Sequence, residues 1–134
     1  MMSKRGAASK PAVLVVDDDL DARTIYATFL RSVGCTVFTA TDGRSALDKA
    51  IELLPELIVM DLAMPRVDGW EAIRRLKDSS WTRDIPVIAL TAVPLSREAA
   101  FAAGCDAYLT KPCEPPVLWA QVQALLGLPR RRSS

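Results

Sequence analysis

The segment Ala12-Val13-Leu14-Val15-Val16, followed by Asp17-Asp18-Asp19, decides the fold class of this chain. Five apolar residues in succession, three of them β-branched, are typical of a short strand that is buried on both faces of a parallel sheet. The three aspartates that follow place several carboxylates at the carboxyl end of that strand. The segment therefore predicts an α/β architecture with polar chemistry at one edge of the sheet.

Strands and helices are expected to alternate along the rest of the chain. Further strands are expected at Thr36–Ala40, Leu57–Met60, 86–90 and 107–109, and helices at 21–33, 44–54, 70–77, 96–103 and 115–126. In the first helix, Ile25, Phe29 and Val33 recur at i, i+4 and i+8, so we expect them to form its apolar face. The alternation predicts a doubly wound five-stranded parallel sheet with helices on both faces and right-handed crossovers.

Length and charge limit the possible classes of protein. The chain has 134 residues, 50% of them hydrophobic, and 17 basic against 16 acidic residues. We expect one domain over residues 12–126, with a mobile basic arm at 1–11 and a mobile basic tail at 127–134. The near-neutral charge argues against direct DNA binding through a broad basic face. No apolar run approaches the roughly 18 residues of a membrane helix, and no signal peptide is apparent, so we expect a cytoplasmic protein without membrane contact.

Histidine and cysteine usage narrows the chemistry further. The chain contains no histidine, which excludes a Ser-His-Asp triad, a Cys-His pair, histidine-ligated zinc and a phosphohistidine carrier. Its three cysteines, Cys35, Cys105 and Cys113, form no C-x-x-C motif, and their number is odd. We expect them to be free thiols packed as small apolar side chains, as suits a reducing cytoplasm.

Polar side chains follow four of the expected strands. The residues at these strand ends are Asp17 to Asp19, Asp61, Thr91 and Lys111. Because the carboxyl ends of parallel strands meet at one edge, we expect carboxylates, one hydroxyl and one ammonium to converge there. Carboxylates without histidine or cysteine favour Mg²⁺, or Mn²⁺ in its place, and lysine and threonine suit phosphoryl oxygens. An aspartate facing a phosphoryl donor can become an aspartyl phosphate.

Each of these residues alone also has an ordinary structural interpretation. Asp19 or Asp21 is more often a helix cap, a strand-end threonine such as Thr91 more often makes a local hydrogen bond, and a lysine such as Lys111 is usually solvated. Their occurrence together, each at the same end of a different strand, favours a functional site.

The motifs around these residues resemble the receiver (phosphoacceptor) domain of bacterial two-component response regulators, of the single-domain, chemotaxis-regulator-like kind. The segments that carry the resemblance are 15–19, 59–65 with Asp68-Gly69, 87–92 and 103–112. The resemblance covers about residues 12–126 and implies the flavodoxin-like receiver fold.

The resemblance assigns a role to each strand-end residue. It implies that Asp61 is the phosphorylation site, and that Asp18, Asp61 and the backbone carbonyl of Ala63 bind Mg²⁺ directly. Asp17 would act on the metal mostly through water. Thr91 would bond a phosphoryl oxygen and Lys111 would pair with it.

Two further expectations come from the same resemblance. Tyr108 matches the aromatic residue that turns inward as Thr91 moves, so these two residues would form the switch. The family's Lys-Pro bond is cis, which predicts a cis bond between Lys111 and Pro112.

The resemblance also implies partners. A histidine kinase would donate the phosphoryl group, and the chain would catalyse its own modification without being a turnover enzyme. Output would be a contact with a downstream protein, or onward transfer to a histidine phosphotransfer protein as a phosphorelay intermediate. We expect a monomer or weak dimer.

Other classes of function fit the sequence less well. A haloacid-dehalogenase-like phosphotransferase also uses a strand-end aspartate, Mg²⁺ and lysine, but it needs a second aspartate at the position of Ala63. Neither G-x-G-x-x-G nor G-x-x-x-x-G-K-[ST] occurs, which disfavours a nucleotide-binding module. A purely structural interaction module would not need Asp61, Thr91 and Lys111 together.

Overall fold

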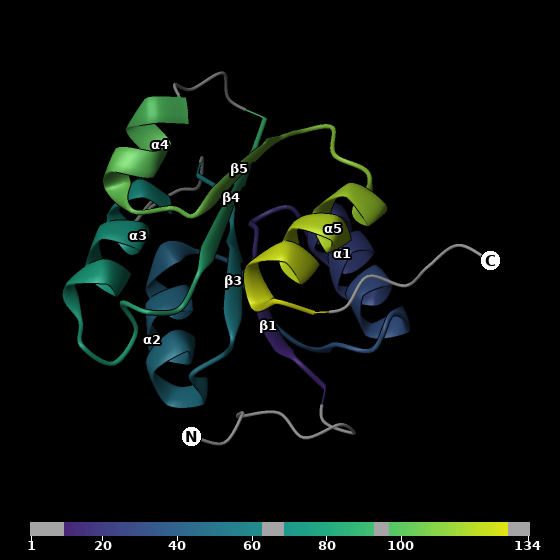
Figure 1. The fold of residues 1–134 in the computed structure, drawn as a ribbon, viewed down its shortest axis with the longest axis horizontal. Coiled ribbons are helices and arrows are strands. Elements are labelled where there is room, and N and C mark those ends of the chain that lie inside the picture. Colours follow the sequence, from purple (N-terminus) through teal and green to yellow (C-terminus); the bar gives the residue numbers. More distant parts are fainter. Residues whose placement is uncertain (1–9, 63–68, 93–96, 129–134) are drawn as a thin grey trace.

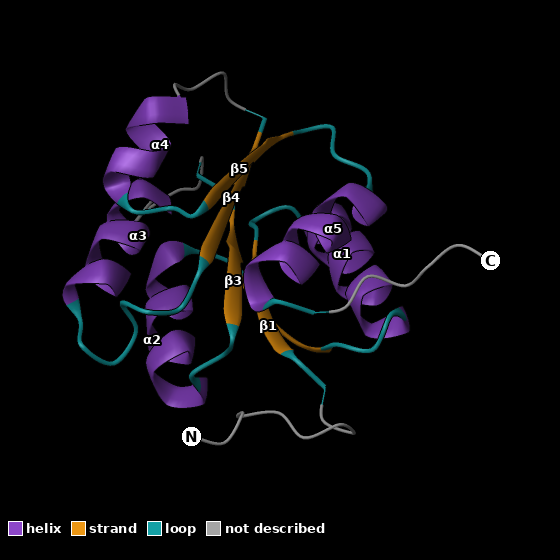
Figure 2. Ribbon diagram, in the orientation of Figure 1, coloured by secondary structure: helices purple, strands orange, loops and turns teal. Residues whose placement is uncertain are grey.

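The chain folds into a five-stranded parallel sheet with helices on both faces, as a computed structural model shows for residues 10–62, 69–92 and 97–128 (Figures 1 and 2). The strands are β1 (Ala12–Val16), β2 (Thr36–Ala40), β3 (Leu57–Met60), β4 (Val87–Thr91) and β5 (Ala107–Thr110). The helices are α1 (Leu20–Ser32), α2 (Gly43–Leu53), α3 (Gly69–Asp78), α4 (Arg97–Ala103) and α5 (Pro115–Leu126). The predicted doubly wound architecture is confirmed.

The strand order is β2-β1-β3-β4-β5, so β3 lies at the centre of the sheet. In β1, Val13 and Val15 pack into the core on one face, while Leu14 and Val16 pack into the core on the other. Helices α1 and α5 cover the first face, and α2, α3 and α4 cover the second (Figure 1). Because β1 is buried on both faces of the sheet, all of its residues are apolar.

Helix α1 presents a different face to the sheet from the one predicted. Its buried residues are Tyr26, Ala27 and Leu30. Ile25 is 54% exposed, so the prediction that Ile25, Phe29 and Val33 form the buried face is wrong. The helix is rotated so that the stripe beside the predicted one, which starts at Tyr26, meets the sheet.

The other element boundaries lie within one residue of those predicted, among the residues that the structure describes. Local capping explains several of them. Asp19 Oδ2 accepts a hydrogen bond from Ala22 N at 3.0 Å and begins α1, and Asp42 Oδ1 accepts one from Ser45 N at 2.8 Å and begins α2. Gly127 adopts the left-handed conformation that ends α5.

The cysteines and the chain ends add three details. All three cysteines are free; Cys35 and Cys105 are buried, while Cys113 is only half-buried. Pro11, just before β1, is buried, and its carbonyl accepts a hydrogen bond from Thr36 N at 2.9 Å. Within the described ranges, no helix has the length and apolar character needed to cross a membrane.

Candidate functional site

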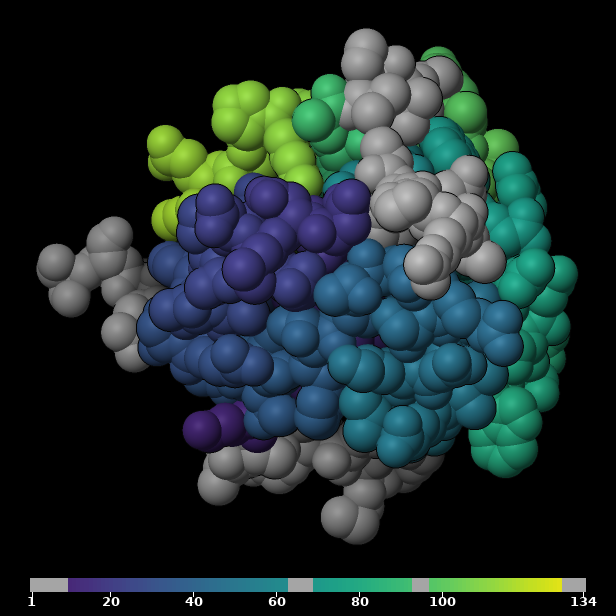
Figure 3. Space-filling view, turned by 180° about the vertical axis from the view of Figure 1, so that it is seen from behind, coloured from purple at the N-terminus to yellow at the C-terminus, as the bar shows by residue number. Residues whose placement is uncertain are grey.

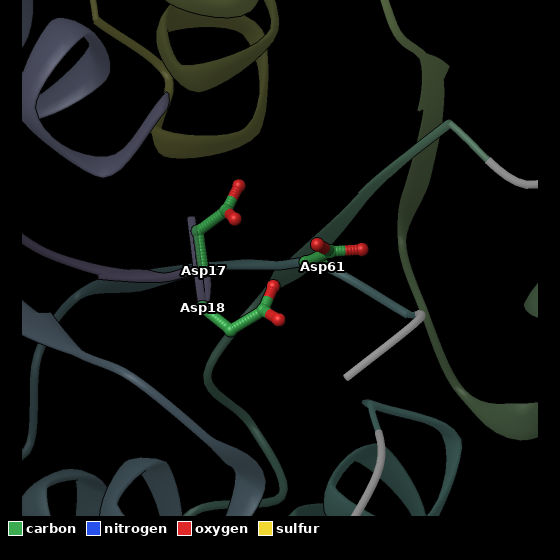
Figure 4. Close-up of side chains that lie close together, drawn as sticks. All are labelled: Asp17, Asp18 and Asp61. Atoms are coloured by element: carbon green, nitrogen blue, oxygen red, sulfur yellow. The ribbon is translucent and has the colours of Figure 1, made fainter. Parts of the chain in front are cut away.

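Three carboxylates meet at the carboxyl edge of the sheet. One oxygen from each of Asp17, Asp18 and Asp61 lies within 4.8 Å of the others (Figure 4). Asp17 follows β1 and Asp61 follows the neighbouring β3. Their backbone N–H groups continue the sheet pattern, since Asp17 N donates to Ala40 O at 3.1 Å and Asp61 N donates to Val16 O at 3.0 Å. The sheet itself therefore fixes two of the three carboxylates, and both are buried.

The turn after β1 is held by hydrogen bonds to Asp17. Asp17 Oδ1 accepts a bond from Asp19 N at 3.0 Å, and its backbone carbonyl accepts one from Arg23 Nη1 at 2.8 Å. Asp18, which lies between Asp17 and Asp19 in the sequence, is exposed. The contact of Arg23 was not predicted from the sequence, where an arginine on a helix indicates only a solvated charge.

Lys111 brings one positive charge to the cluster. Its Nζ donates to Asp17 Oδ2 at 2.7 Å and lies 3.6 Å from Asp61 Oδ2, and its side chain is 19% exposed. Burial alone would lower the pKa of Lys111. The hydrogen bond to Asp17 and the charges of Asp17 and Asp61 outweigh burial, so the pKa lies above its ordinary value and the ammonium stays charged.

Thr91 and Tyr108 are both buried beside this site. Thr91 is the last residue of β4, next to β3, and its carbonyl accepts a hydrogen bond from Lys111 N at 2.9 Å. Tyr108 lies on the neighbouring β5, and the guanidinium of Arg97 is 5.8 Å from the centre of its ring. The predicted cis bond between Lys111 and Pro112 is present.

Two residues contribute to the site although the sequence assigns them no role. A Cβ on Gly69 would lie 2.2 Å from the backbone oxygen of Asp61, so only glycine fits there. Tyr26 Oη donates to the carbonyl of Cys113 at 2.7 Å, just beyond Lys111. Ala63, whose carbonyl was expected to bind the metal, lies outside the described residues.

The charge balance of the cluster suits a divalent cation. The cluster holds three carboxylates, and the ammonium of Lys111 contacts two of them, Asp17 and Asp61, which are both buried. Buried negative charge is costly unless a cation offsets it. The donors are oxygens only, which fits Mg²⁺ and, equally well by donor type, Mn²⁺.

Solved structures of other proteins have the same fold as this chain. Chemotaxis protein CheY4 of Vibrio cholerae aligns with a TM-score of 0.82 and 30% identity, over 87% of this chain and 98% of that chain. The receiver domain of sensor histidine kinase PA1611 from Pseudomonas aeruginosa PAO1 aligns with a TM-score of 0.82 and 33% identity, over 89% of this chain and 99% of that chain. The PA1611 receiver domain has a magnesium ion coordinated in its active site cleft.

Curated relatives include the transcriptional regulatory protein PrrA of Mycobacterium tuberculosis, 42% identical over 128 residues, which are 94% of this chain and 53% of PrrA. The transcriptional regulator RpaA of Synechocystis is 38% identical over 87% of this chain and 49% of RpaA. This chain thus spans about half the length of these relatives. The family described as response regulator receiver domain matches residues 13–123. With the sheet, its carboxylate cluster and these relatives in agreement, the chain belongs to the receiver domain family of two-component response regulators.

Proposed function

We propose that Asp61 accepts a phosphoryl group from a histidine kinase and that the modified domain switches a protein-binding surface. The observation that carries this proposal is the placement of the buried Asp61 carboxylate, 3.6 Å from Lys111 Nζ and within 4.8 Å of two further carboxylates. The cluster combines a nucleophile, a fixed positive charge and a set of oxygen donors suited to a metal.

Among the three carboxylates, the contacts favour Asp61 as the nucleophile. The two oxygens of Asp17 have a structural task, since one accepts a hydrogen bond from Asp19 N in the turn after β1 and the other holds Lys111 Nζ. Asp18 is exposed, where water would compete for a reactive intermediate. Asp61 is buried, and the Lys111 ammonium lies 3.6 Å from its Oδ2, where it can offset charge on a phosphoryl group.

The transfer itself needs little covalent chemistry from the protein. A carboxylate oxygen of Asp61 attacks phosphorus, and a P–O bond forms while the P–N bond to the donor histidine breaks. The bonding electrons stay on the departing imidazole nitrogen, which takes up a proton. Lys111 offsets negative charge on the phosphoryl oxygens, and the Thr91 hydroxyl donates a hydrogen bond to one of them.

The metal would be held by Asp18 and Asp61 directly, with the carbonyl of Ala63, and by Asp17 through water. When bound, Mg²⁺ supplies positive charge that balances the phosphoryl oxygens and the acidic cluster. Mn²⁺ is expected to substitute, because both ions prefer oxygen ligands.

The proposal also covers how phosphorylation would change the structure and which kind of protein would respond. Thr91 and Tyr108 lie on adjacent strands, so a movement of Thr91 toward a phosphoryl group can be transmitted to β5 and α4. We propose a downstream protein as the target, with a histidine phosphotransfer protein as the alternative for a phosphorelay. The chain would be modified once per molecule and would not act as a turnover enzyme. A haloacid-dehalogenase-like activity gains no support, since Ala63 stands where that class needs an acid.

The decisive experiment compares the wild-type chain with Asp61→Asn after incubation with acetyl phosphate and Mg²⁺, followed by intact mass spectrometry. We expect the wild type to gain one phosphoryl group and the variant none, because the amide is not a nucleophile. Asp48→Asn is the matched control, since it removes the same charge from an exposed site on α2 and should still be modified. Modification of the Asp61→Asn protein would refute the assignment.

A further inference from the structure

The connection between β5 and α5, residues 111–114, places Lys111 in the site and borders a hollow on its α1 side. This hollow, of about 540 Å³, lies at the surface where part of the connection faces α1. Its walls include Ile25 and Ala22 on one side and Pro112 and Pro115 on the other. Where the hollow lies, the connection has no side-chain contact with α1, so the contacts that remain between the two segments carry more weight.

One hydrogen bond spans the two walls of this hollow. Tyr26, on α1, donates from its hydroxyl to the backbone carbonyl of Cys113 at 2.7 Å, across 87 positions of sequence. In Figure 3 the connection, yellow-green, lies against α1, purple-blue. The ring of Tyr26 is buried, and it packs in the same core as Leu118 of α5. The donor is thus held in place by the core, while the acceptor belongs to the connection.

The bond to Tyr26 complements a second anchor of the same connection. Lys111 N donates to Thr91 O at 2.9 Å, which fixes the connection to β4 on the sheet side. Tyr26 fixes it two residues further on, on the α1 side. Between these anchors, the Lys111 side chain reaches Asp17 at 2.7 Å and approaches Asp61 at 3.6 Å. Burial raises the pKa of Tyr26, so the phenol stays protonated and remains a donor at neutral pH.

We infer that Tyr26 is a positioning residue for phosphoryl transfer: its hydroxyl holds the connection so that the Lys111 ammonium stays between Asp17 and Asp61. The inference rests on the proposed function of Asp61 and Lys111. Tyr26 does not touch the reacting atoms; it acts by keeping Lys111 preorganised, which lowers the reorganisation needed in the transition state.

The test uses Tyr26→Phe, which removes only the hydroxyl and keeps the buried ring. The matched control is Thr82→Val, because Thr82 Oγ1 makes a comparable buried bond to Leu76 O at 2.7 Å outside the site. The first measurement is the rate of modification by acetyl phosphate at saturating Mg²⁺. We expect Tyr26→Phe to slow it about three- to tenfold, the range that one neutral hydrogen bond can account for, and Thr82→Val to leave it unchanged.

The second measurement reports on Lys111 without using phosphate. Each protein is labelled briefly with an amine-reactive acetylating reagent, and the modification of each lysine is followed by peptide mass spectrometry. Release of the connection should raise the labelling of Lys111 several-fold in Tyr26→Phe, while the exposed Lys10 keeps its wild-type labelling as an internal reference. A loss of stability alone, as in Thr82→Val, should not single out Lys111.

The outcomes separate this inference from the proposed function. Faster Lys111 labelling together with slower phosphorylation supports both. Wild-type labelling of Lys111 in Tyr26→Phe overturns the inference, whatever happens to the rate. A wild-type rate in Tyr26→Phe also overturns it, provided that the wild-type chain is phosphorylated. If labelling rises but even the wild-type chain is never phosphorylated, the positioning of Lys111 stands and the proposed function fails.

Discussion

Gly69 leaves no room for a side chain beside the proposed nucleophile. Because a Cβ there would lie 2.2 Å from the backbone oxygen of Asp61 and 2.6 Å from Leu62 Cα, the β3 end or the start of α3 would have to shift. We expect Gly69→Ala to lose about 1–3 kcal/mol of unfolding free energy and to slow phosphorylation, since the displaced backbone carries Asp61. Urea unfolding and intact-mass kinetics measure the two effects.

Gly127→Ala is the control for this substitution. Gly127 has a φ of +66°, but in the part of the chain that the structure describes no atom other than those of its chain neighbours and its own helix backbone lies within 4 Å of the place that an alanine methyl group would take, so alanine there brings backbone strain without a clash with these residues. It should cost about 1 kcal/mol and leave phosphorylation unchanged. Equal phosphorylation rates for Gly69→Ala and the wild type would show that the close approach has no influence on Asp61.

The residues of the site differ in how far the sequence could predict them. The structure does bring Asp17, Asp18, Asp61 and Lys111 together, because residues that follow parallel strands share one edge of the sheet. The contact of Tyr26 with Cys113 joins residues 87 positions apart and depends on how α1 is rotated. No local pattern encodes that rotation, so the contact appears only in three dimensions.

At the scale of elements, α1 offers a direct test of which face meets the sheet. Leu30 is fully buried, whereas Ile25 is mostly exposed. Leu30→Ala should cost about 2–5 kcal/mol of unfolding free energy, the range for a deleted core leucine, while Ile25→Ala should stay within about 0.5 kcal/mol of the wild type. Urea unfolding of the two variants decides the matter; a larger loss for Ile25→Ala would restore the face predicted from the sequence.

The positions of the strands could be predicted from the sequence, whereas the buried face of α1 could not. A continuous apolar run such as that of β3 is buried whichever way its side chains point, so its position alone defines its environment. Helix α1 carries two adjacent stripes, one through Ile25 and Phe29 and one through Tyr26 and Leu30. The sequence favours the more hydrophobic stripe, yet the sheet packs against the stripe that contains Tyr26, whose hydroxyl donates to the carbonyl of Cys113.

For the whole molecule, buried thiols predict how stability changes with pH. Burial raises the pKa of Cys35 and of Cys105 from 9.0 to about 11. Below pH 9 both thiols are largely protonated in the folded and in the unfolded state. Above pH 9 the unfolded chain loses these protons first, which stabilises the unfolded state relative to the folded state. The free energy of unfolding should therefore fall as the pH rises from about 9 to 11, by up to roughly 2–3 kcal/mol per thiol.

Urea titrations across this pH range, under reducing conditions, measure the change. The variant with both Cys35→Ala and Cys105→Ala is the control, because it lacks these two thiols but keeps Lys111 and Tyr26, whose pKa values are also raised in the folded protein. Its stability should fall less steeply than that of the wild type. Identical slopes would show that the thiols do not cause the alkaline loss.

Because of the strand order, local opening of the sheet displaces some residues of the site more easily than others. Sheets open most easily at their edges, and β5, which leads into Lys111, is an edge strand, whereas β3, which leads into Asp61, is central. A fluctuation that frays β5 therefore withdraws the lysine while the aspartates stay on an intact sheet. The fraction of molecules with a complete site is then governed by the free energy of this partial opening, which is smaller than that of global unfolding.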